Sequence, residues 1–226
     1  EFGIDILIKF MEGLPLFLSP LDNRSSWSNA EFDNYKIIIH ELLLYLVAIG
    51  LKNENYVFVE EILYSSYFTK DKHNHNNEAK RFDTFYGHTD IIKAYYNQTH
   101  SQNFHSAMAD FVVKRIPEFI SKRILVQADL LCYHISELNG LRWFPMTYIY
   151  DTSGRYELFY RLESMRHFDK VKVLFNVETI DEFKQKLDEL EEKDKGKSYR
   201  VSYSGSFDSV TPLYRLIDKE KLGTKR

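Results

Sequence analysis

The stretch RFDTFYGH contains an arginine and a histidine, Arg81 and His88, whose types suit metal-independent RNA cleavage. In that reaction an imidazole moves a proton at the 2′-hydroxyl, and a guanidinium stabilises the charge on the phosphate. Residues seven apart lie about 340° around an α-helix, so both side chains would share a face if the segment were helical. Gly87 interrupts the pattern and argues against a helix here.

The spacing of Arg81 and His88 resembles the pattern of HEPN ribonucleases, in which four to six residues separate an arginine from a histidine. HEPN ribonucleases are helical bundles that work as dimers, so the resemblance implies that both residues are catalytic. A second match, Arg161 with His167, lies in a segment of better helical spacing, but its side chains would point roughly 240° apart. A metal-independent ribonuclease is therefore our alternative interpretation.

A group of histidines lies in a polar part of the chain, at His73, His75, His88, His100 and His105. A His-x-His pair with a more distant histidine is able to bind zinc. No cysteine or closely spaced carboxylate motif supports that reading, so we interpret the group as a polar surface loop and predict no metal site. Because residues 70–100 lack apolar periodicity, we expect them to be mobile or to leave the core.

A third candidate is an anion site near YSGSFDS, residues 203–209, which follows a predicted strand. Backbone amides of a turn rich in glycine and serine are able to hold a phosphate. The sequence has no phosphate loop of the form Gly-x-x-x-x-Gly-Lys-Ser/Thr, and it has neither Gly-x-Ser-x-Gly nor Gly-x-Gly-x-x-Gly. The candidate ligand-binding residues are Arg161, Arg166, His167, Ser204 and Gly205, with Lys170 beside them.

The adjacent residues His40 and Glu41 interrupt a long apolar run, AEFDNYKIIIHELLLYLVAIGLK. Neighbouring residues on a helix point about 100° apart and do not share a ligand. A zinc-protease helix needs a second histidine four residues after the first, where this chain has Leu44. We therefore predict structural roles for both, with Glu41 paired to an arginine, a tyrosine hydroxyl or a helix N-terminus, because a buried unpaired carboxylate is costly.

The elements that position these residues are mostly helices. Apolar residues on nearly every face predict a central helix over residues 32–51, preceded by the capping box of Ser28 and Glu31. Capping signals at Thr179 and Thr211 predict two later helices. Other helices are expected at residues 1–12, 54–68, 101–115, 124–138 and 155–168.

Strands are predicted near residues 143–150, from RWFPMTYIY, and near residues 199–204, from SYRVSYSG. The fold class is therefore mainly α: a helical bundle over residues 1–140, followed by a small α/β unit over residues 141–226. Asn139-Gly140 ends the last helix of the bundle, and we place the domain boundary there.

Composition narrows the class of protein. The 226 residues are 44% hydrophobic and 28% charged, as expected for a soluble globular protein. The formal charge of −3 makes nucleic acid an unlikely partner, and the single cysteine, Cys132, fits a reducing cytoplasm. We identify no signal peptide and no uninterrupted apolar run long enough to span a membrane, so no membrane partner is expected.

Three stretches of the chain resemble the helical region that follows an effector domain in bacterial immunity-type proteins. They are IIIHELLLYLVAIGLKNENYVFVEEILYSSYF, VQADLLCYHISEL and RWFPMTYIY. Some proteins of that type are headed by a TIR or a sirtuin-like NAD-consuming domain. The resemblance implies a sensing or assembly role and supplies no catalytic residue. The chain also opens without Met or a capping signal, EFGIDILIKF, which leads us to expect a fragment of a longer protein.

The sequence therefore favours a non-catalytic regulatory, sensing or protein-interaction domain of a larger bacterial cytoplasmic protein, with a role in anti-phage defence. Its expected partner is another protein or a second copy of the chain, and its ligand a phage component or a nucleotide. No cofactor is predicted.

Overall fold

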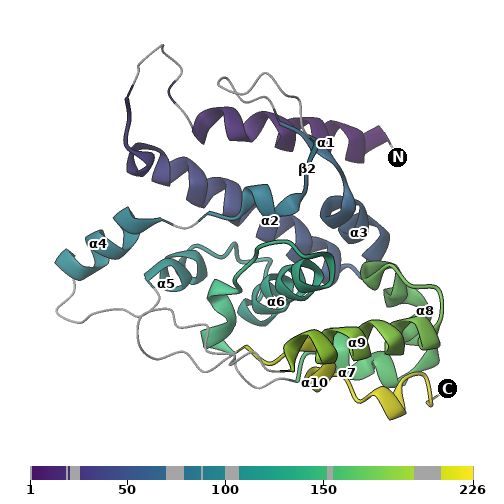
Figure 1. The fold of residues 1–226 in the computed structure, drawn as a ribbon. Helices are drawn as coiled ribbons and strands as arrows, with labels where there is room; N and C mark the ends of the chain where they lie inside the picture. The colour runs from purple at the N-terminus through teal and green to yellow at the C-terminus, as the bar shows by residue number, and fades with distance from the viewer. Residues whose placement is uncertain are drawn as a thin grey trace.

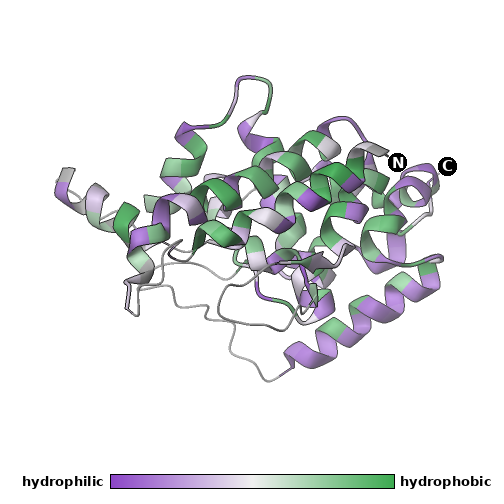
Figure 2. Ribbon diagram, turned by 90° about the horizontal axis from the view of Figure 1, so that it is seen from above, coloured by the Kyte–Doolittle hydropathy of each residue, from purple (hydrophilic) through white to green (hydrophobic). Residues whose placement is uncertain are grey.

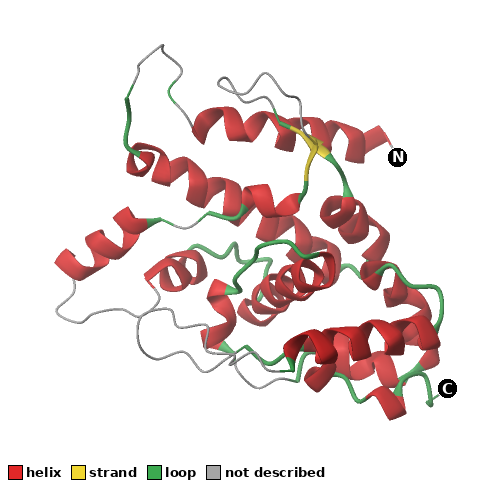
Figure 3. Cartoon of the chain, viewed as in Figure 1, coloured by secondary structure: helices red, strands yellow, loops and turns green. Residues whose placement is uncertain are grey.

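Two long helices, α2 (Asp33–Lys52) and α6 (Lys122–Asn139), pack against each other at the centre of the molecule (Figure 1). The computed structural model describes residues 2–18, 20, 26–69, 79–87, 89–99, 107–151, 155–195 and 210–225. Within these residues the protein is mainly α-helical, as the sequence predicts (Figure 3).

The remaining α-helices are α1 (Phe2–Gly13), α3 (Tyr56–Tyr64), α4 (Asp90–Thr99), α5 (Ala107–Lys114), α7 (Glu157–Tyr160), α8 (Met165–Val171), α9 (Ile180–Asp194) and α10 (Leu213–Leu216). Short 3₁₀-helices are η1 (Leu14–Leu18), η2 (Asn29–Phe32), η3 (Phe82–Phe85), η4 (Met146–Tyr150), η5 (Arg161–Glu163), η6 (Lys172–Phe175) and η7 (Lys219–Lys221). The described strands are β1 (Tyr67–Phe68) and β2 (Ala79–Lys80), which pair antiparallel with Tyr67 opposite Lys80.

The predicted capping signals act at two of three positions. Ser28 and Glu31 form the reciprocal capping box, which starts η2 and leads into α2. Thr179 caps α9 by accepting a hydrogen bond from the amide of Glu182 at 3.2 Å. The helix predicted after Thr211 is present as α10, but the predicted cap is wrong. The N-cap of α10 is Pro212, and the Thr211 hydroxyl lies 3.4 Å from the hydroxyl of Tyr148.

The central helix α2 buries its His–Glu pair, as predicted. The His40 ring stacks on Trp143 with 4.9 Å between ring centroids. Glu41 lies 3.0 Å from Nε of Arg115, which is ion-pair range, although the N–H does not align for a hydrogen bond. Burial raises the pKa of Glu41 and Arg115 opposes that shift. Both residues therefore have structural partners.

The stretch from Ala30 to Lys52 is the one described helix that is long and apolar enough to cross a membrane, by length and composition. His40 and Glu41 interrupt this stretch, so it is not an uninterrupted apolar run, although it passes this looser test of length and composition. Of its most apolar window, 56% is buried inside the protein. Helices α3 and α6 cover it, and Figure 2 shows hydrophobic residues gathered in these inner helices, whereas α9 at the margin is mostly hydrophilic.

The strand predicted near residues 143–150 is absent, and a 3₁₀-helix, η4, takes its place. Asp129 on α6 is fully buried and accepts three hydrogen bonds of 2.8 Å from this segment. The donors are Nε1 of Trp143 and the amide and hydroxyl of Thr147. Because the Thr147 amide already has a side-chain acceptor, it does not need a strand partner. The second predicted strand, 199–204, lies outside the described residues.

Residues 79–87 and 89–99 contain more regular structure than the sequence indicates. They contain β2, η3 and α4, and the rings of Phe82 and Phe85 belong to the hydrophobic core. The expectation that all of residues 70–100 leave the core is therefore wrong for this part. A single 3₁₀ turn is too short to produce the apolar periodicity by which a packed segment is predicted. Residues 70–78 lie outside the description.

The boundary expected near residue 140 coincides with the end of α6, where Gly140 adopts the left-handed conformation at φ 67°. Buried hydrophobic residues on both sides of it belong to one cluster, which runs from Met11 to Leu222. Helix α9 joins this cluster through the apolar stripe that its sequence predicts, with Phe183, Leu187 and Leu190 buried.

Replacing Asp129 with asparagine is expected to lower the free energy of unfolding by about 2–4 kcal/mol, because the new NH₂ group would face donors that now share a carboxylate. Chemical denaturation at neutral pH measures the loss. Asp169→Asn on the exposed face of α8 is the matched control and should change stability by no more than about 0.5 kcal/mol. Equal stability of the two variants would contradict this role of Asp129.

A second prediction concerns His134, which is fully buried on α6 with no hydrogen-bond partner for either ring nitrogen in the described residues. Burial lowers the pKa of His134 to about 3. Between that value and 6.5 the unfolded chain binds more protons, so stability must fall as the pH falls.

From pH 7 to pH 5, His134 alone should therefore cost the native chain about 2 kcal/mol. His134→Leu removes this group while His40 still titrates, so its unfolding free energy should fall by about 2 kcal/mol less over the same interval. Denaturant titrations of both chains at the two pH values test this. Parallel pH profiles would show that His134 is not the buried neutral base described.

Candidate functional site

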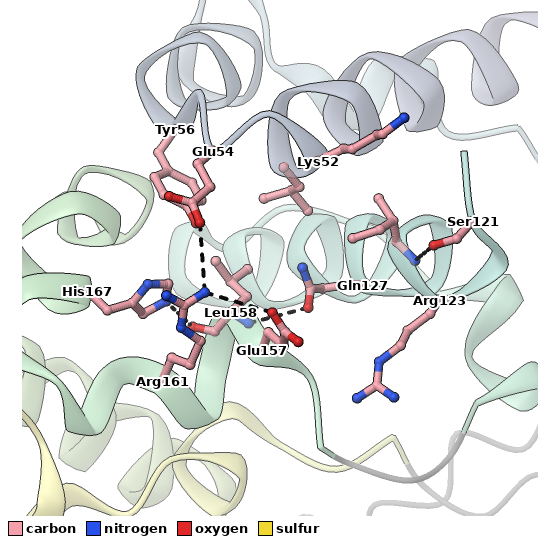
Figure 4. Close-up of a pocket in the computed structure, with 12 residues that line it drawn as sticks. Lys52, Glu54, Tyr56, Ser121, Arg123, Gln127, Glu157, Leu158, Arg161 and His167 are labelled. Atoms are coloured by element: carbon pink, nitrogen blue, oxygen red, sulfur yellow. Dashed lines mark hydrogen bonds and ion pairs between the residues drawn. The ribbon is translucent and has the colours of Figure 1, made fainter. Parts of the chain in front are cut away.

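A two-part pocket lies where the turn after α2 meets the start of α6 and the segment from α7 to α8. Figure 4 draws the residues that line its less polar part. The more polar part has a volume of about 260 Å³ and is lined by Glu54, Arg161, Ser164, Arg166, His167 and Lys170. The other part, of about 230 Å³, is lined by Leu51, Lys52, Glu54, Tyr56, Ser121, Arg123, Ile124, Gln127, Glu157, Leu158, Arg161 and His167. The two parts share Glu54, Arg161 and His167, so they adjoin each other.

The cationic side of the pocket is built by a broken helix. The sequence predicts one helix over residues 155–168, but the chain turns from α7 into η5 and then restarts as α8. The C-terminal segment holds this break in place, because the amide of Met165 donates to the carbonyl of Lys225 at 2.9 Å and that of Gly223 to the carbonyl of Leu162 at 3.0 Å. The break places Arg161, Arg166 and Lys170 around one hollow.

Three cations face one carboxylate in the polar part. Glu54 lies 2.8 Å from Nζ of Lys170 and 3.8 Å from a guanidinium nitrogen of Arg161. The hydrogen bond from Lys170 and its charge lower the pKa of Glu54. Arg161 also lies 3.8 Å from Glu157, and Arg166 has no ion-pair partner among the residues described. The polar part therefore keeps an excess of positive charge.

The backbone of Glu54 has an unusual conformation. Its φ is 51°, in the left-handed region that costs an L-residue about 1–2 kcal/mol. The residue follows the end of α2, where its amide bonds the carbonyl of Leu51 and the amide of Asn55 bonds that of Gly50. Glycine is the usual residue in such a position. A glutamate here is strained, and its carboxylate lies among the pocket cations.

His167 is the neutral member of the site. It is 4% exposed, its Nε2 lies 3.3 Å from the carbonyl of Leu158, and its ring meets that of Tyr56 edge-on at 6.2 Å. Burial lowers the pKa of His167, and the Leu158 carbonyl opposes that shift. Because the imidazole is neutral near pH 7, it contributes a hydrogen bond and not a charge to anion binding.

The predicted anion-binding residues separate into two groups. Arg161, Arg166 and His167 line one pocket with Lys170, whereas Ser204 and Gly205 lie outside the described residues. The pocket also contains residues that sequence reasoning missed, because they come from elements distant in the chain: Lys52, Glu54 and Tyr56 near the turn before α3, and Ser121, Arg123 and Gln127 on α6. For Glu54 and Gln127 no local motif gives a signal.

The alternative catalytic pair does not share a helix. Arg81 precedes η3, which ends at Phe85, and Tyr86 is already extended, so the segment is not a helix on which Arg81 and His88 would share a face, in agreement with the interruption that Gly87 indicates. The guanidinium of Arg81 lies over the ring of Tyr64, 5.8 Å from its centroid. His88 itself lies outside the described residues.

No group of three histidine, cysteine, aspartate or glutamate side chains that could hold a metal occurs among the residues described. All five histidines of the candidate zinc group lie outside that description. Cys132 is buried, and burial raises the pKa of its thiol, which disfavours the reactive thiolate. What the described pocket offers chemically is anion binding.

Comparison of the chain with profiles of protein families, with curated proteins and with solved structures gives no match.

If Glu54 serves the pocket and not the fold, Glu54→Gly should be at least as stable as the native chain, because relief of backbone strain offsets the loss of exposed ion pairs. Glu54→Ala should be about 1 kcal/mol less stable than Glu54→Gly, since alanine keeps the strain. Urea denaturation of the three chains tests this order.

Asn176 provides the matched control, because it also has a positive φ, of 50°, and lies outside the pocket. Its Ala and Gly variants should differ by a similar amount. A loss of more than about 1 kcal/mol in Glu54→Gly would assign the carboxylate to the fold.

Proposed function

We propose that this chain is a non-catalytic sensing domain of a larger bacterial cytoplasmic protein, and that it binds a phosphate-bearing small molecule. The observation that carries the proposal is the hollow lined by Arg161, Arg166 and Lys170 together with a single carboxylate, which pairs with Arg161 and Lys170. Planar guanidinium groups bind phosphate oxygens in pairs, and lysine adds a compact charge. A role in anti-phage defence would follow from the resemblance to effector-associated helical regions.

Binding is favoured over catalysis by the kinds of groups that line the pocket. The histidine among its described lining residues is buried and neutral, with Nε2 3.3 Å from a backbone carbonyl, and no cysteine lines either part. The described residues whose pKa values are displaced furthest by burial include His40, Asp129 and His134, none of which lines the pocket. The geometry adds no support to the ribonuclease alternative, since its two residues do not share a helix.

Glu54 gives the domain a means of responding to its ligand. An incoming phosphate would take the place of the carboxylate at Lys170 and Arg161, since these cations are not able to bind both fully. Glu54 would then be released from its strained position in the turn that joins α2 to α3. A protein partner or a second copy of the chain would bind differently to this turn before and after the release of Glu54. The proposal involves neither a membrane nor nucleic acid.

The proposal is tested by titrating inorganic pyrophosphate and a set of nucleotides into the purified chain in a calorimeter at low salt. Arg161→Gln and Arg166→Gln should each weaken binding about tenfold or more, since a hydrogen bond to a charged group contributes about 1.5–3 kcal/mol. Arg142→Gln is the matched control, because Arg142 is exposed and does not line the pocket. It should bind as the native chain does.

Absence of binding by the native chain to every phosphate compound would overturn the proposal. Equal loss in Arg142→Gln would also contradict it, because binding would then reflect general surface charge. Metal-independent cleavage of RNA by the native chain, lost in His88→Ala, would favour the ribonuclease.

A further inference from the structure

The less polar part of the pocket is suited to bind a flat ring of a ligand. Leu51, Ile124 and Leu158 contribute aliphatic surface to it, and Tyr56 contributes an aromatic ring. The space of about 230 Å³ corresponds to several water molecules of roughly 30 Å³ each. It adjoins the cationic part, with which it shares the lining residues Glu54, Arg161 and His167. A ligand with a flat, weakly polar end and an anionic end would match this order of surfaces.

Two buried polar side chains line this less polar part, His167 and Gln127. Gln127 on α6 is 6% exposed, and its Oε1 accepts a hydrogen bond from the amide of Leu158 at 3.3 Å. This bond fixes the orientation of the side-chain amide, so Nε2 is on the other side. Figure 4 shows that nitrogen pointing away from Leu158. It has no partner among the residues that the structure describes.

The NH₂ group of Gln127 lines the pocket and is available to donate a hydrogen bond to a ligand. Nε2 is the end of the Gln127 amide that points away from Leu158, and it offers donors to a ligand. The group that it recognises must therefore be an acceptor, such as a ring nitrogen or an exocyclic carbonyl. Nucleobases carry such acceptors on their edges.

We infer that the ligand is a nucleotide whose phosphate binds at Arg161, Arg166 and Lys170 and whose base occupies the less polar part. Nε2 of Gln127 donates to an acceptor on the base and makes the site specific for ligands that carry one. This inference rests on the proposed function, because it assumes that the cationic part binds phosphate. It adds the class of ligand and assigns Gln127 as the residue that selects it.

The test compares ligands that share a phosphate and differ in the base. Ribose 5-phosphate and the common nucleoside monophosphates are titrated into the native chain by calorimetry. At least one nucleoside monophosphate should bind about tenfold or more tightly than ribose 5-phosphate, because a site built to bond an acceptor discriminates against a ligand that lacks one.

Gln127→Met keeps the size and neutrality of the side chain and removes the donor. It should abolish the preference for the nucleotide and change the affinity for ribose 5-phosphate by less than about twofold. Gln127→Glu is the second variant, since it retains an acceptor for the Leu158 amide and therefore preserves the local fold. It should also lose the preference, and thermal unfolding monitored by circular dichroism shows that both variants are folded.

The outcomes separate the two proposals. If ribose 5-phosphate and the nucleotides bind equally well, the cationic part binds phosphate but the inference about the base is wrong. A preference that survives in both Gln127 variants would likewise overturn the role of Gln127. If neither ribose 5-phosphate nor pyrophosphate binds, the proposed function fails together with this inference.

Discussion

The buried carboxylate of Asp129 is the constraint on which the arrangement of the central helices and the pocket depends. It has no contact with solvent, and burial raises its pKa to about 6 in spite of three hydrogen bonds that act in the opposite direction. A group that is costly to bury is retained only where its partners are fixed. Its donors belong to the segment that follows α6 and contains η4. The carboxylate therefore holds this segment against α6.

The pocket follows from this attachment in two steps. Gln127 lies two residues before Asp129 on α6, and it accepts a hydrogen bond from Leu158 at the start of the broken helix. The break then places three cations opposite the turn after α2, where Glu54 is held in the left-handed conformation. The site is therefore assembled from three separate parts of the chain, each of which is held by backbone contacts.

Much of the helical framework can be predicted from the sequence, because its signals are local. The apolar run of α2, the capping box at Ser28 and the end of α6 at Gly140 depend only on neighbouring residues. The segment 143–150 could not be predicted in this way. Its aromatic and β-branched composition favours a strand, and the interaction that makes it a 3₁₀-helix comes from Asp129, which is distant in sequence.

The residues of the candidate site also divide into those that are close in sequence and those that tertiary contacts bring together. Arg161, Arg166, His167 and Lys170 lie within ten residues, so the sequence groups them. A continuous helix would point Arg161 and His167 roughly 240° apart, and the break at η5 brings them to one pocket. The roles of Glu54 and Gln127 depend on tertiary contacts with that segment, which no local pattern encodes. The histidines that raise a metal interpretation fall outside the described residues, and the described part supplies no metal-binding group.

The hollow between Glu54 and the broken helix is the proposed phosphate site. The most direct measurement is a two-dimensional NMR titration of the ¹⁵N-labelled chain with inorganic pyrophosphate, which follows the Nε–Hε signals of the arginines. The signals of Arg161 and Arg166 should move and saturate together. Those of Arg142 and Arg215, which do not line the pocket, should stay in place. Equal movement of all four signals, or none at Arg161 and Arg166, would contradict the proposed phosphate site.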